Sequence, residues 1–395
     1  MTVFRWQDLL NSTGEFSVPP QMWVEMNACM SRDEIVGLLQ DAVDNTGMAF
    51  PFRQITLDRA TDDFRKLKFL DTSTLATHQT WTTDFSYRYG FQDVVVGRNT
   101  VGSLSSDFFH QQHRYGCDMS AIPSALRGWA DRGMRRGLFR ALWTLNLDQV
   151  TPSEIRAVAA NRKYVAAQYR PSAAKYIYDR YAGGGRVLDF SAGWGDRLSA
   201  ALASDRVTHY TGIDPNTNLH AGYKAQVEAY NRPLNGDLLD WFAADTFEPK
   251  SVKLIHSPAE DVDLDGPFDL VFTSPPYFDK ERYTKESTQS WVRYKTLSQW
   301  LNGFMYPVLQ KVWDRLVPGG HLCVNISDIR LEQRVPGTQD RIHGLICDPM
   351  NDHIGTLPGA NYLGALGMAM MVRPNPRDVQ EMDKFCEPMW LWQKK

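Results

Sequence analysis

The sequence predicts an α/β protein with a mostly parallel sheet in its second half and a smaller α+β region before it. In the second half, short apolar runs alternate regularly with helical patterns. Gly, Pro and Asp residues separate these segments, as expected where strands and helices end. The first 150 residues show no such alternation. We therefore expect an accessory domain over residues 1–150 and the α/β domain over residues 151–395.

The expected sheet has seven strands, each a short apolar run. They cover residues 186–191, 209–215, 252–258, 268–274, 321–328, 364–372 and 388–394. Helical patterns lie at 171–181, around Leu198 and Leu202, at 216–230, and at 290–316, where Pro318-Gly319-Gly320 is a stop signal. Helices of this length between strands imply βαβ units.

The first 150 residues are expected to hold helices at 30–44 and 123–145. Short strands are expected at 55–57, 81–87 and 91–101. Thr151-Pro152-Ser153-Glu154 is a good helix start with Thr151 or Ser153 as the cap, which is why the boundary is placed near residue 150.

Composition excludes several classes of protein. Apolar residues make up 43% and charged residues 23% of the chain, which is ordinary for globular proteins and excludes disorder or a coiled coil. The sequence holds neither a membrane-spanning apolar stretch nor a signal peptide, so we expect a cytoplasmic protein. Its five cysteines form no Cys-x-x-Cys pair, which argues against structural zinc and disulfides, and no metal is expected.

A glycine turn follows the first expected strand, at Asp189-Phe190-Ser191-Ala192-Gly193-Trp194-Gly195. Small residues at 192, 193 and 195 allow a sharp turn into a helix and close approach of a ligand. The turn lacks the third glycine of a dinucleotide site and the Gly-Lys-Ser/Thr of a phosphate loop. We expect Asp189, Ser191, Ala192, Gly193 and Gly195 to contact a cofactor.

Acidic residues follow the next two strands. Asp214 ends the second strand, where a carboxylate can accept hydrogen bonds from both hydroxyls of a ribose. The alternative is that Asp214 caps the helix that begins at Asn216. Glu260 and Asp261 follow the third strand, where an adenine ring would lie, although acidic loops are often just solvated.

The segments VLDFSAGWGDRL, GIDPN and FDLVFTSPPY resemble class I S-adenosylmethionine-dependent methyltransferases that act on exocyclic amino groups of DNA bases. The resemblance covers residues 165–394 and implies the Rossmann-like fold of that class, S-adenosylmethionine as cofactor, and double-stranded DNA with a flipped base as partner. It also places Tyr169 near the methionine end of the cofactor. Phe190-Ser191 stand where the family has Pro-Phe, and Trp194 replaces a small residue. The layout with CDPMND and EPMWLW is similar to bacteriophage methyltransferase-like proteins, and restriction-modification is the expected setting.

Ser274-Pro275-Pro276-Tyr277, directly after the fourth strand, is expected to be the catalytic tetrapeptide. The nitrogen of an exocyclic amine is a poor nucleophile because its lone pair is delocalised into the ring. Acceptors for its two N–H groups, such as the Ser274 hydroxyl and the Pro275 carbonyl, would help to expose that lone pair. The two prolines fix the bend, and Tyr277 can stack on a flipped base. The alternative is an ordinary turn, but its place at the end of a strand favours catalysis.

In the resembled enzymes, Ser at the first position favours cytosine N4 over adenine N6. A polar, aromatic loop over residues 278–290 follows the tetrapeptide, and we expect Asp279, Tyr283 or Gln289 to contact the base. An exposed loop with a helix cap is the alternative. Asn325, Ser327 and Asp328 also lie at the expected active-site edge.

Positive charge is concentrated in residues 121–186, which contain twelve Lys or Arg and four Asp or Glu, a net of +8 in a chain of net charge −3. Arg132 and Arg136 lie on one expected helix with Trp129 and Trp143, and we expect them to contact DNA phosphates. The alternative is a solvated helix. Because the last expected strand lies at the end of the given sequence, we expect residues 1–150, 278–290 or 329–362 to read the target.

Three functions remain open from the sequence. The first is methylation of an exocyclic amine in DNA. The second is methylation of an RNA base or of a protein glutamine, which needs similar chemistry. The third is a non-catalytic accessory protein that binds DNA through a methyltransferase fold.

Overall fold

The computed structural model describes residues 3–233, 247–334, 341–370 and 385–395. The chain forms two compact units. The helical unit contains residues 1–54 and 111–167, and the sheet unit contains residues 55–110 and 168–395. This division differs from the expected single boundary near residue 150, because residues 55–110 pack with the sheet.

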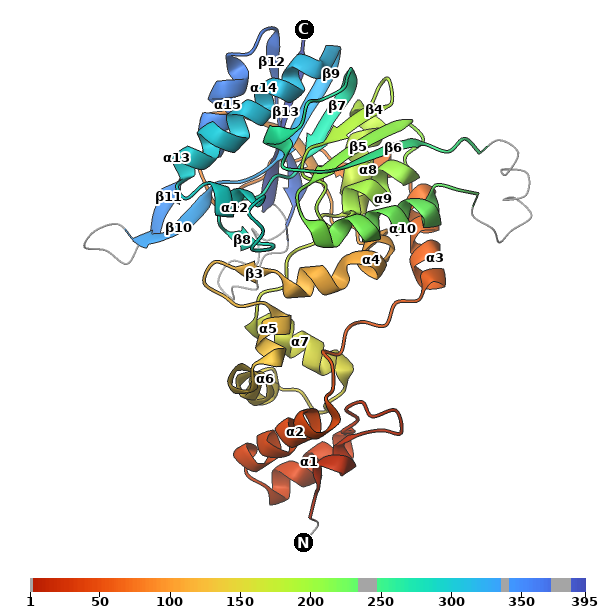
Figure 1. Cartoon of the computed structure of the whole chain (residues 1–395), viewed down its shortest axis with the longest axis vertical. Coiled ribbons are helices and arrows are strands. Elements are labelled where there is room, and N and C mark those ends of the chain that lie inside the picture. The colour runs from red at the N-terminus through yellow and green to blue at the C-terminus, as the bar shows by residue number, and fades with distance from the viewer. Residues whose placement is uncertain (1–2, 234–246, 335–340, 371–384) are drawn as a thin grey trace. The chain divides into compact units, whose positions relative to one another are not determined.

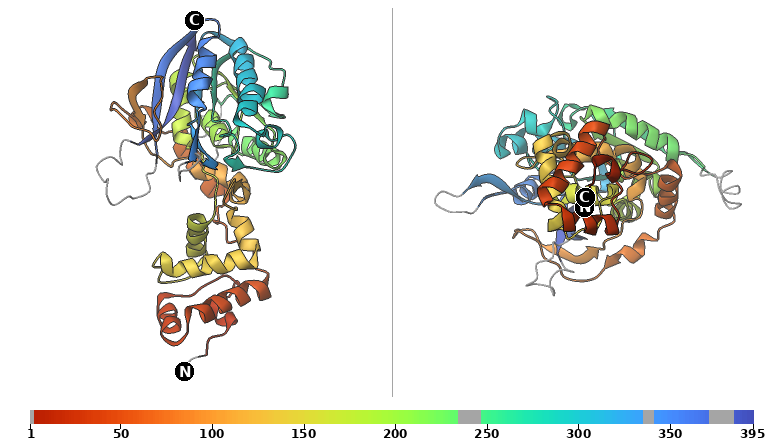
Figure 2. Two further views of the ribbon diagram at one scale, coloured as in Figure 1. Left: turned by 90° about the vertical axis from the view of Figure 1, so that its left-hand side faces the viewer. Right: turned by 90° about the horizontal axis from the view of Figure 1, so that it is seen from below.

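The helical unit consists mainly of five α-helices, with α1 and α2 (red) and α5, α6 and α7 (yellow to olive) visible in Figure 2. Ser31 and Glu34 form the capping box that starts α2, and Gly47 ends it in a left-handed conformation. Thr151 and Glu154 form the capping box of α7, at the helix start that the sequence predicts. The element bounds are η1 (Trp6–Leu9), α1 (Pro20–Cys29), α2 (Arg32–Thr46), β3 (Asp118–Met119), α5 (Ala125–Ala130), α6 (Arg132–Thr144) and α7 (Pro152–Arg162), and α4 (Ser103–Gly116) runs from one unit into the other.

The sheet unit is built on a nine-stranded sheet in the order β1-β2-β12-β13-β9-β7-β4-β5-β6 (Figure 1). Its strands are β1 (Ala76–Thr77), β2 (Phe91–Val96), β4 (Arg186–Asp189), β5 (His209–Asp214), β6 (Ser251–His256), β7 (Phe268–Thr273), β9 (Leu316–Asn325), β12 (Ala360–Ala369) and β13 (Cys386–Lys394). The five strands from β6 to β9 in this order are parallel to one another. Strand β13 is antiparallel to both β9 and β12.

This order contains the seven expected strands. Counted along the chain from β4, it reads 3-2-1-4-5-7-6, a doubly wound sheet with an antiparallel last strand between the fifth and sixth. The class I, Rossmann-like methyltransferase fold is therefore confirmed. The sheet differs from the expectation in having two further strands, since β2 pairs in parallel with β12 and β1 pairs with β2. The expected end of the sixth strand, residues 371–372, lies outside the described residues.

Helices flank this sheet in two groups, one with α8, α9 and α10 and one with α14 and α15 (Figure 1). Their bounds are α3 (Leu57–Lys68), α8 (Pro171–Tyr181), α9 (Asp196–Ala203), α10 (His220–Tyr230), α12 (Ser290–Arg293), α13 (Leu297–Trp300), the π-helical turn η5 (Leu301–Met305), α14 (Tyr306–Arg315) and α15 (Cys347–Gly355). Short elements are η2 (Thr72–Leu75), η3 (Thr217–Leu219), η4 (Ala259–Asp261), β8 (Glu281–Arg282), β10 (Ile329–Arg334) and β11 (Arg341–Gly344).

Three local expectations are wrong. Residues 55–57 are not a strand, because Thr56 caps α3. Residues 81–87 form a loop in which Trp81 stacks on Phe91 with ring centroids 4.1 Å apart. The expected helix 290–316 is interrupted after α12, where the Tyr294 hydroxyl donates to the Gly303 carbonyl at 2.8 Å.

Candidate active site

The glycine turn joins β4 to α9, and its two glycines have different roles. Both have positive φ angles, +61° at Gly193 and +74° at Gly195. A Cβ atom added at Gly195 would lie 2.3 Å from the Gln226 side chain, whereas one at Gly193 would meet nothing closer than 3.7 Å. Gly195 therefore allows α9 and α10 to pack closely. Gly193 is the glycine whose backbone a ligand can approach.

Asp189 is buried at the end of β4, and protein groups occupy both of its carboxylate oxygens. Its partners are the Arg197 Nε at 2.7 Å, the Thr273 hydroxyl at 2.9 Å, the Tyr210 hydroxyl at 3.0 Å and the Ser191 amide at 3.2 Å. Asp189 was expected to contact the cofactor. Its hydrogen bonds instead make it a positioning residue that ties the ends of β4 and β7, and Tyr210 of β5, to the glycine turn.

Asp214 ends β5 beside the same turn. Its Oδ2 accepts a hydrogen bond from the Gly193 amide and its Oδ1 accepts one from the Asn216 amide, both at 2.9 Å. Burial raises the pKa of Asp214 to about 6. Each oxygen still has capacity for a further donor, as ribose binding requires. The capping contact and ribose binding are therefore compatible.

Glu260 and Asp261 lie in η4, after β6, and face α12. Glu260 Oε1 accepts hydrogen bonds from Arg293 at 2.8 Å and from the Tyr294 hydroxyl at 2.9 Å. Arg293 also pairs with Asp261 at 2.9 Å and 3.1 Å. Burial raises the pKa of Glu260. This ion-pair cluster fixes the turn after β6, so any contact with adenine would have to come from the remaining oxygens.

Tyr169 packs beside the Asp189–Arg197 pair. The Arg197 guanidinium lies 5.2 Å from the centroid of its ring, and Phe272 meets that ring edge-on at 5.7 Å. The Tyr169 hydroxyl donates to the Met389 sulfur at 3.4 Å. Tyr169 thus lies close to the Asp189–Arg197 pair that supports the glycine turn.

The tetrapeptide follows β7, which is the neighbour of β4 in the sheet. Thr273, the residue before Ser274, donates to Asp189 at 2.9 Å. The tetrapeptide and the glycine turn therefore leave the same edge of the sheet side by side, at the point where the strand order reverses. This is where doubly wound proteins bind ligands.

Tyr277 is connected to two residues that the tetrapeptide does not contain. Its hydroxyl donates to Glu387 Oε1 at 2.7 Å, and Glu387 Oε2 accepts a hydrogen bond from Asn325 Nδ2 at 3.2 Å. Burial raises the pKa values of both Tyr277 and Glu387. Asn325 is fully buried, and its Oδ1 has no hydrogen-bond partner among the described residues. The Asn325 Oδ1 atom at this edge of the sheet can therefore accept a hydrogen bond from a ligand.

The loop over residues 278–290 runs from the tetrapeptide back to the turn after Asp214. Thr217 donates through its amide to Glu286 at 3.3 Å, and the Thr288 hydroxyl donates to the Pro215 carbonyl at 3.4 Å. Tyr283 meets Trp194 of the glycine turn edge-on, with ring centroids 5.5 Å apart. The loop therefore covers the edge between the two expected sites.

Two other expected base contacts lie at the ends of this loop. Asp279 is within 3.8 Å of Arg282, a long ion pair. Gln289 is only 4% exposed, and its Nε2 has no hydrogen-bond partner among the described residues. A buried amide donor without a partner costs free energy, so Gln289 is the stronger candidate for a ligand contact.

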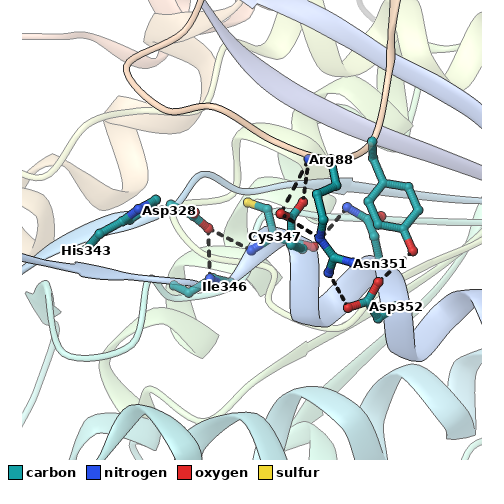
Figure 3. Close-up of polar contacts among 9 residues, drawn as sticks. Arg88, Asp328, His343, Ile346, Cys347, Asn351 and Asp352 are labelled. Atoms are coloured by element: carbon teal, nitrogen blue, oxygen red, sulfur yellow. Dashed lines mark hydrogen bonds and ion pairs between the residues drawn. The ribbon is translucent and has the colours of Figure 1, made fainter.

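Asp328, after β9, has a structural role (Figure 3). Its Oδ1 accepts hydrogen bonds from the amides of Ile346 and Cys347, both at 2.8 Å, and its Oδ2 contacts His343 Nε2 at 2.7 Å. Nearby, Arg88 binds Asp348 and Asp352 of α15. These contacts cap α15 and attach the loop around Arg88 to it. Asp328 is thereby satisfied by protein donors.

The arginines of α6 are paired within the helical unit. Arg132 and Arg135 bind Asp44 of α2, and Arg136 and Arg140 bind Asp33 at 3.2 Å and 2.7 Å. Trp129 is buried, and Trp143 packs against Trp23 with ring centroids 5.0 Å apart. Aspartates of α2, including one in its first turn, therefore pair with the arginines of the helix that was expected to contact phosphates. These ion pairs favour a role for the arginines in packing α6 against α2.

The residues at the glycine turn fit an S-adenosylmethionine molecule by their chemistry. Gly193 leaves room beside its backbone, and Asp214 offers acceptors for ribose hydroxyls. Among the described residues, no cluster of three His, Cys, Asp or Glu side chains is arranged to hold a metal ion. None of the described helices combines the length and apolarity that a membrane span requires.

The strand order and the glycine turn together define the class I, Rossmann-like methyltransferase fold. Residues 268–360 match the N6/N4 methyltransferase family model, described as DNA methylase, which confirms the resemblance to DNA amino-methyltransferases. That match begins at β7 and includes the whole tetrapeptide.

Several solved structures are similar to the chain. TrmN from Thermus thermophilus is 15% identical with a TM-score of 0.35, and the alignment covers 57% of this chain and 49% of TrmN, about half its length. An rRNA methylase from Streptococcus thermophilus is 12% identical with a TM-score of 0.31, covering 58% of this chain and 99% of that one. No curated protein sequence matches the chain.

Sequence reasoning missed Glu387, Thr273 and Arg197 as parts of the site. Glu387 lies at the start of β13, and because β13 is antiparallel, its start lies at the same edge as the ends of β7 and β9. An acidic residue that opens the last strand was the available signal. Nothing in the sequence indicated Thr273, because its partner Asp189 lies far away in the chain. Nothing indicated Arg197 either, because its ion pair with Asp189 depends on how the glycine turn folds.

Proposed function

We propose that this protein transfers a methyl group from S-adenosylmethionine to the exocyclic amine of a flipped base in double-stranded DNA, with cytosine N4 favoured over adenine N6. The observation that carries the proposal is the hydrogen bond between Thr273 and Asp189, because it holds the tetrapeptide beside the glycine turn. The match of residues 268–360 to the DNA methylase family supports DNA as the substrate.

The chain's own residues would then bind and orient the amine. When bound, the cofactor supplies an electrophilic methyl carbon. The Ser274 hydroxyl and the Pro275 carbonyl accept hydrogen bonds from the amine, and the proline pair keeps both acceptors in place without reorganisation. The Tyr277 ring, fixed by its bond to Glu387, gives the base a face to stack on. Such stacking contributes about 1–3 kcal/mol per base.

The cofactor would be held on the other side of Thr273. Asp214 accepts the ribose hydroxyls, the backbone at Ser191, Ala192 and Gly193 lies against the ligand, and Tyr169 borders its methionine end. Asp279, Tyr283 and Gln289 of the covering loop are the proposed contacts to the base. The helical unit is the proposed module for target recognition.

The test is transfer of a labelled methyl group from S-adenosylmethionine to double-stranded DNA, single-stranded DNA and RNA. We expect label in DNA, and its loss in Pro275→Ala and Tyr277→Ala proteins that keep the wild-type melting temperature. Pro318→Ala, an exposed residue at the start of β9, at the opposite edge of the sheet from the tetrapeptide, is the matched proline control and keeps wild-type transfer. Label in RNA or in protein alone would contradict the DNA assignment, and binding of DNA without any transfer would indicate an accessory protein.

A further inference from the structure

Methylation of an amine leaves a proton that has to go somewhere. The new bond joins the amine nitrogen to the methyl carbon, the carbon–sulfur bond of the donor breaks with its electron pair going to sulfur, and the nitrogen becomes a cation. A neutral methylamino product forms only when that nitrogen gives up one proton. Ser274 is a poor final acceptor, because a serine hydroxyl is hardly basic.

Glu387 is placed to supply this missing basic group. Its Oε1 is 2.7 Å from the Tyr277 hydroxyl of the tetrapeptide, and the Ser274 hydroxyl is close enough to Tyr277 to influence its ionisation. Its Oε2 is 3.2 Å from Asn325 Nδ2. The carboxylate is thus oriented by two hydrogen bonds from the ends of two neighbouring strands, β7 and β9, and each of its oxygens can accept one more.

We infer, on the basis of the proposed function, that Glu387 is a catalytic residue which accepts a hydrogen bond from the target amine and then takes its proton. In the first role it shares one of the amine's two N–H groups with the Ser274 hydroxyl in a three-centre hydrogen bond, while the Pro275 carbonyl accepts the other. In the second it becomes a neutral carboxyl group and later loses the proton to water.

The surroundings of Glu387 suit a group that gains and loses a proton. Burial raises its pKa, while hydrogen bonds from Tyr277 and Asn325 and the charge of Lys280 oppose this rise. A general base works best when its pKa lies near the operating pH. The titratable, charged and polar groups that face it are Tyr277, Lys280, Glu281, Asn325, Arg170 and Tyr169.

The unpaired Oδ1 of Asn325 supports a substrate at this position. It is buried and has no partner in the part of the chain that the structure describes. The Asn325 amide already donates to Glu387 and to the Pro388 carbonyl at 3.0 Å, so its acceptor is left for a donor from outside the protein. A polar N–H or O–H group of a bound substrate is such a donor.

The experiment compares Glu387→Gln with wild type in single-turnover methyl transfer to DNA, across pH, at saturating S-adenosylmethionine. Saturation removes the effect of Asp214, which acts on cofactor affinity. Gln keeps the size and the acceptor for Tyr277 but cannot take a proton. We expect the rate to fall about 10²- to 10³-fold, in the range of general-base catalysis. We also expect the acid limb of the wild-type profile, where Glu387 is protonated and inactive, to disappear. Glu228→Gln, an exposed residue of α10, is the matched control.

Each outcome decides the inference. A Glu387→Gln protein within threefold of wild type, or one that keeps the acid limb, overturns it and leaves the proposed function standing. If Glu387→Gln fails to fold, Glu387→Asp decides instead, because it must transfer methyl groups slowly and retain an acid limb, and the absence of that limb refutes the role. A wild-type protein that methylates no base would overturn the proposed function and this inference together.

Discussion

Charged side chains are held in opposite ways at the carboxyl edge of the sheet and on helix α6. At the sheet edge, Asp189 and Asp214 are buried, Glu387 is half-buried, and all three are fixed by residues of neighbouring strands or of the glycine turn. On α6, Arg132, Arg136 and Arg140 stay largely exposed and pair with aspartates of α2. Polar groups in a low-dielectric setting interact strongly, whereas solvent screens exposed pairs.

This difference indicates which parts of the molecule can hold a charged group that reacts with a ligand. A strand end can hold a charged group that has an unused hydrogen-bonding site, because the stability of the packed sheet offsets the desolvation cost of that group. On the surface of α6, neighbouring aspartates pair with the arginines, so these side chains have fewer hydrogen-bonding sites left for a ligand. Four variants probe this contrast, in order of decreasing effect.

Arg197→Met should be the most damaging of these changes to stability. Arg197 is 4% exposed and pairs with Asp189 at 2.7 Å, so its loss leaves a buried carboxylate without its cation. Breaking such a pair costs about 3–5 kcal/mol. Urea unfolding followed by fluorescence gives the value. A loss below about 1 kcal/mol would mean that the buried and the exposed pairs are equivalent.

Ser274→Ala should reduce methyl transfer without unfolding the protein. The change removes one preorganised acceptor, which is expected to lower kcat about 10²- to 10³-fold by analogy with the loss of one donor from an oxyanion hole. Steady-state assays with labelled donor measure it, and calorimetry should show unchanged cofactor affinity. A fall in affinity with kcat intact would place Ser274 on the cofactor instead.

Asp214→Asn should weaken S-adenosylmethionine binding and remove its pH dependence. Hydrogen bonds from ribose hydroxyls favour the carboxylate, so wild-type affinity should fall as the pH drops below about 6, the pKa of Asp214. Loss of a charged acceptor costs about 1.5–3 kcal/mol. Calorimetry at pH 5 and pH 8 tests both points.

Titration of Asp214 also determines whether the free energy of unfolding rises or falls with pH. Burial raises the pKa of Asp214 from 3.8 to about 6, so between these values the folded protein binds a proton that the unfolded chain has released. The free energy of unfolding contributed by this group therefore falls as pH rises through that window. The Asn variant should lack this fall, and an unchanged slope would contradict the pKa.

Arg132→Ala on α6 should have the smallest effect. Arg132 pairs with Asp44 at 2.7 Å, and its side chain is 67% exposed, so we expect a loss of about 0–1 kcal/mol. DNA affinity should change less than about threefold at physiological salt. A marked fall in affinity, with a shallower dependence on salt, would show instead that α6 contacts phosphates.

Local signals explain what the sequence could predict. The glycine turn, the seven strands and the tetrapeptide each lie within one short segment, and alternation of strand and helix determines that their ends share an edge. The pairing of β2 with β12 and the contact of Tyr277 with Glu387 join residues far apart in the chain, so no local pattern reveals them. The ion pairs of the α6 arginines also join distant residues, because their partners lie on α2, and the expected phosphate contact of Arg132 and Arg136 stays a prediction.

The most direct measurement of the central claim is mass spectrometry of nucleosides from DNA that the protein has methylated. If the sheet edge accepts hydrogen bonds from an exocyclic amine, we expect N4-methylcytosine or, less favoured, N6-methyladenine in this DNA. DNA treated with the Pro275→Ala protein should contain neither base. Finding 5-methylcytosine, or unmodified DNA alongside methylated RNA or protein, would contradict the account.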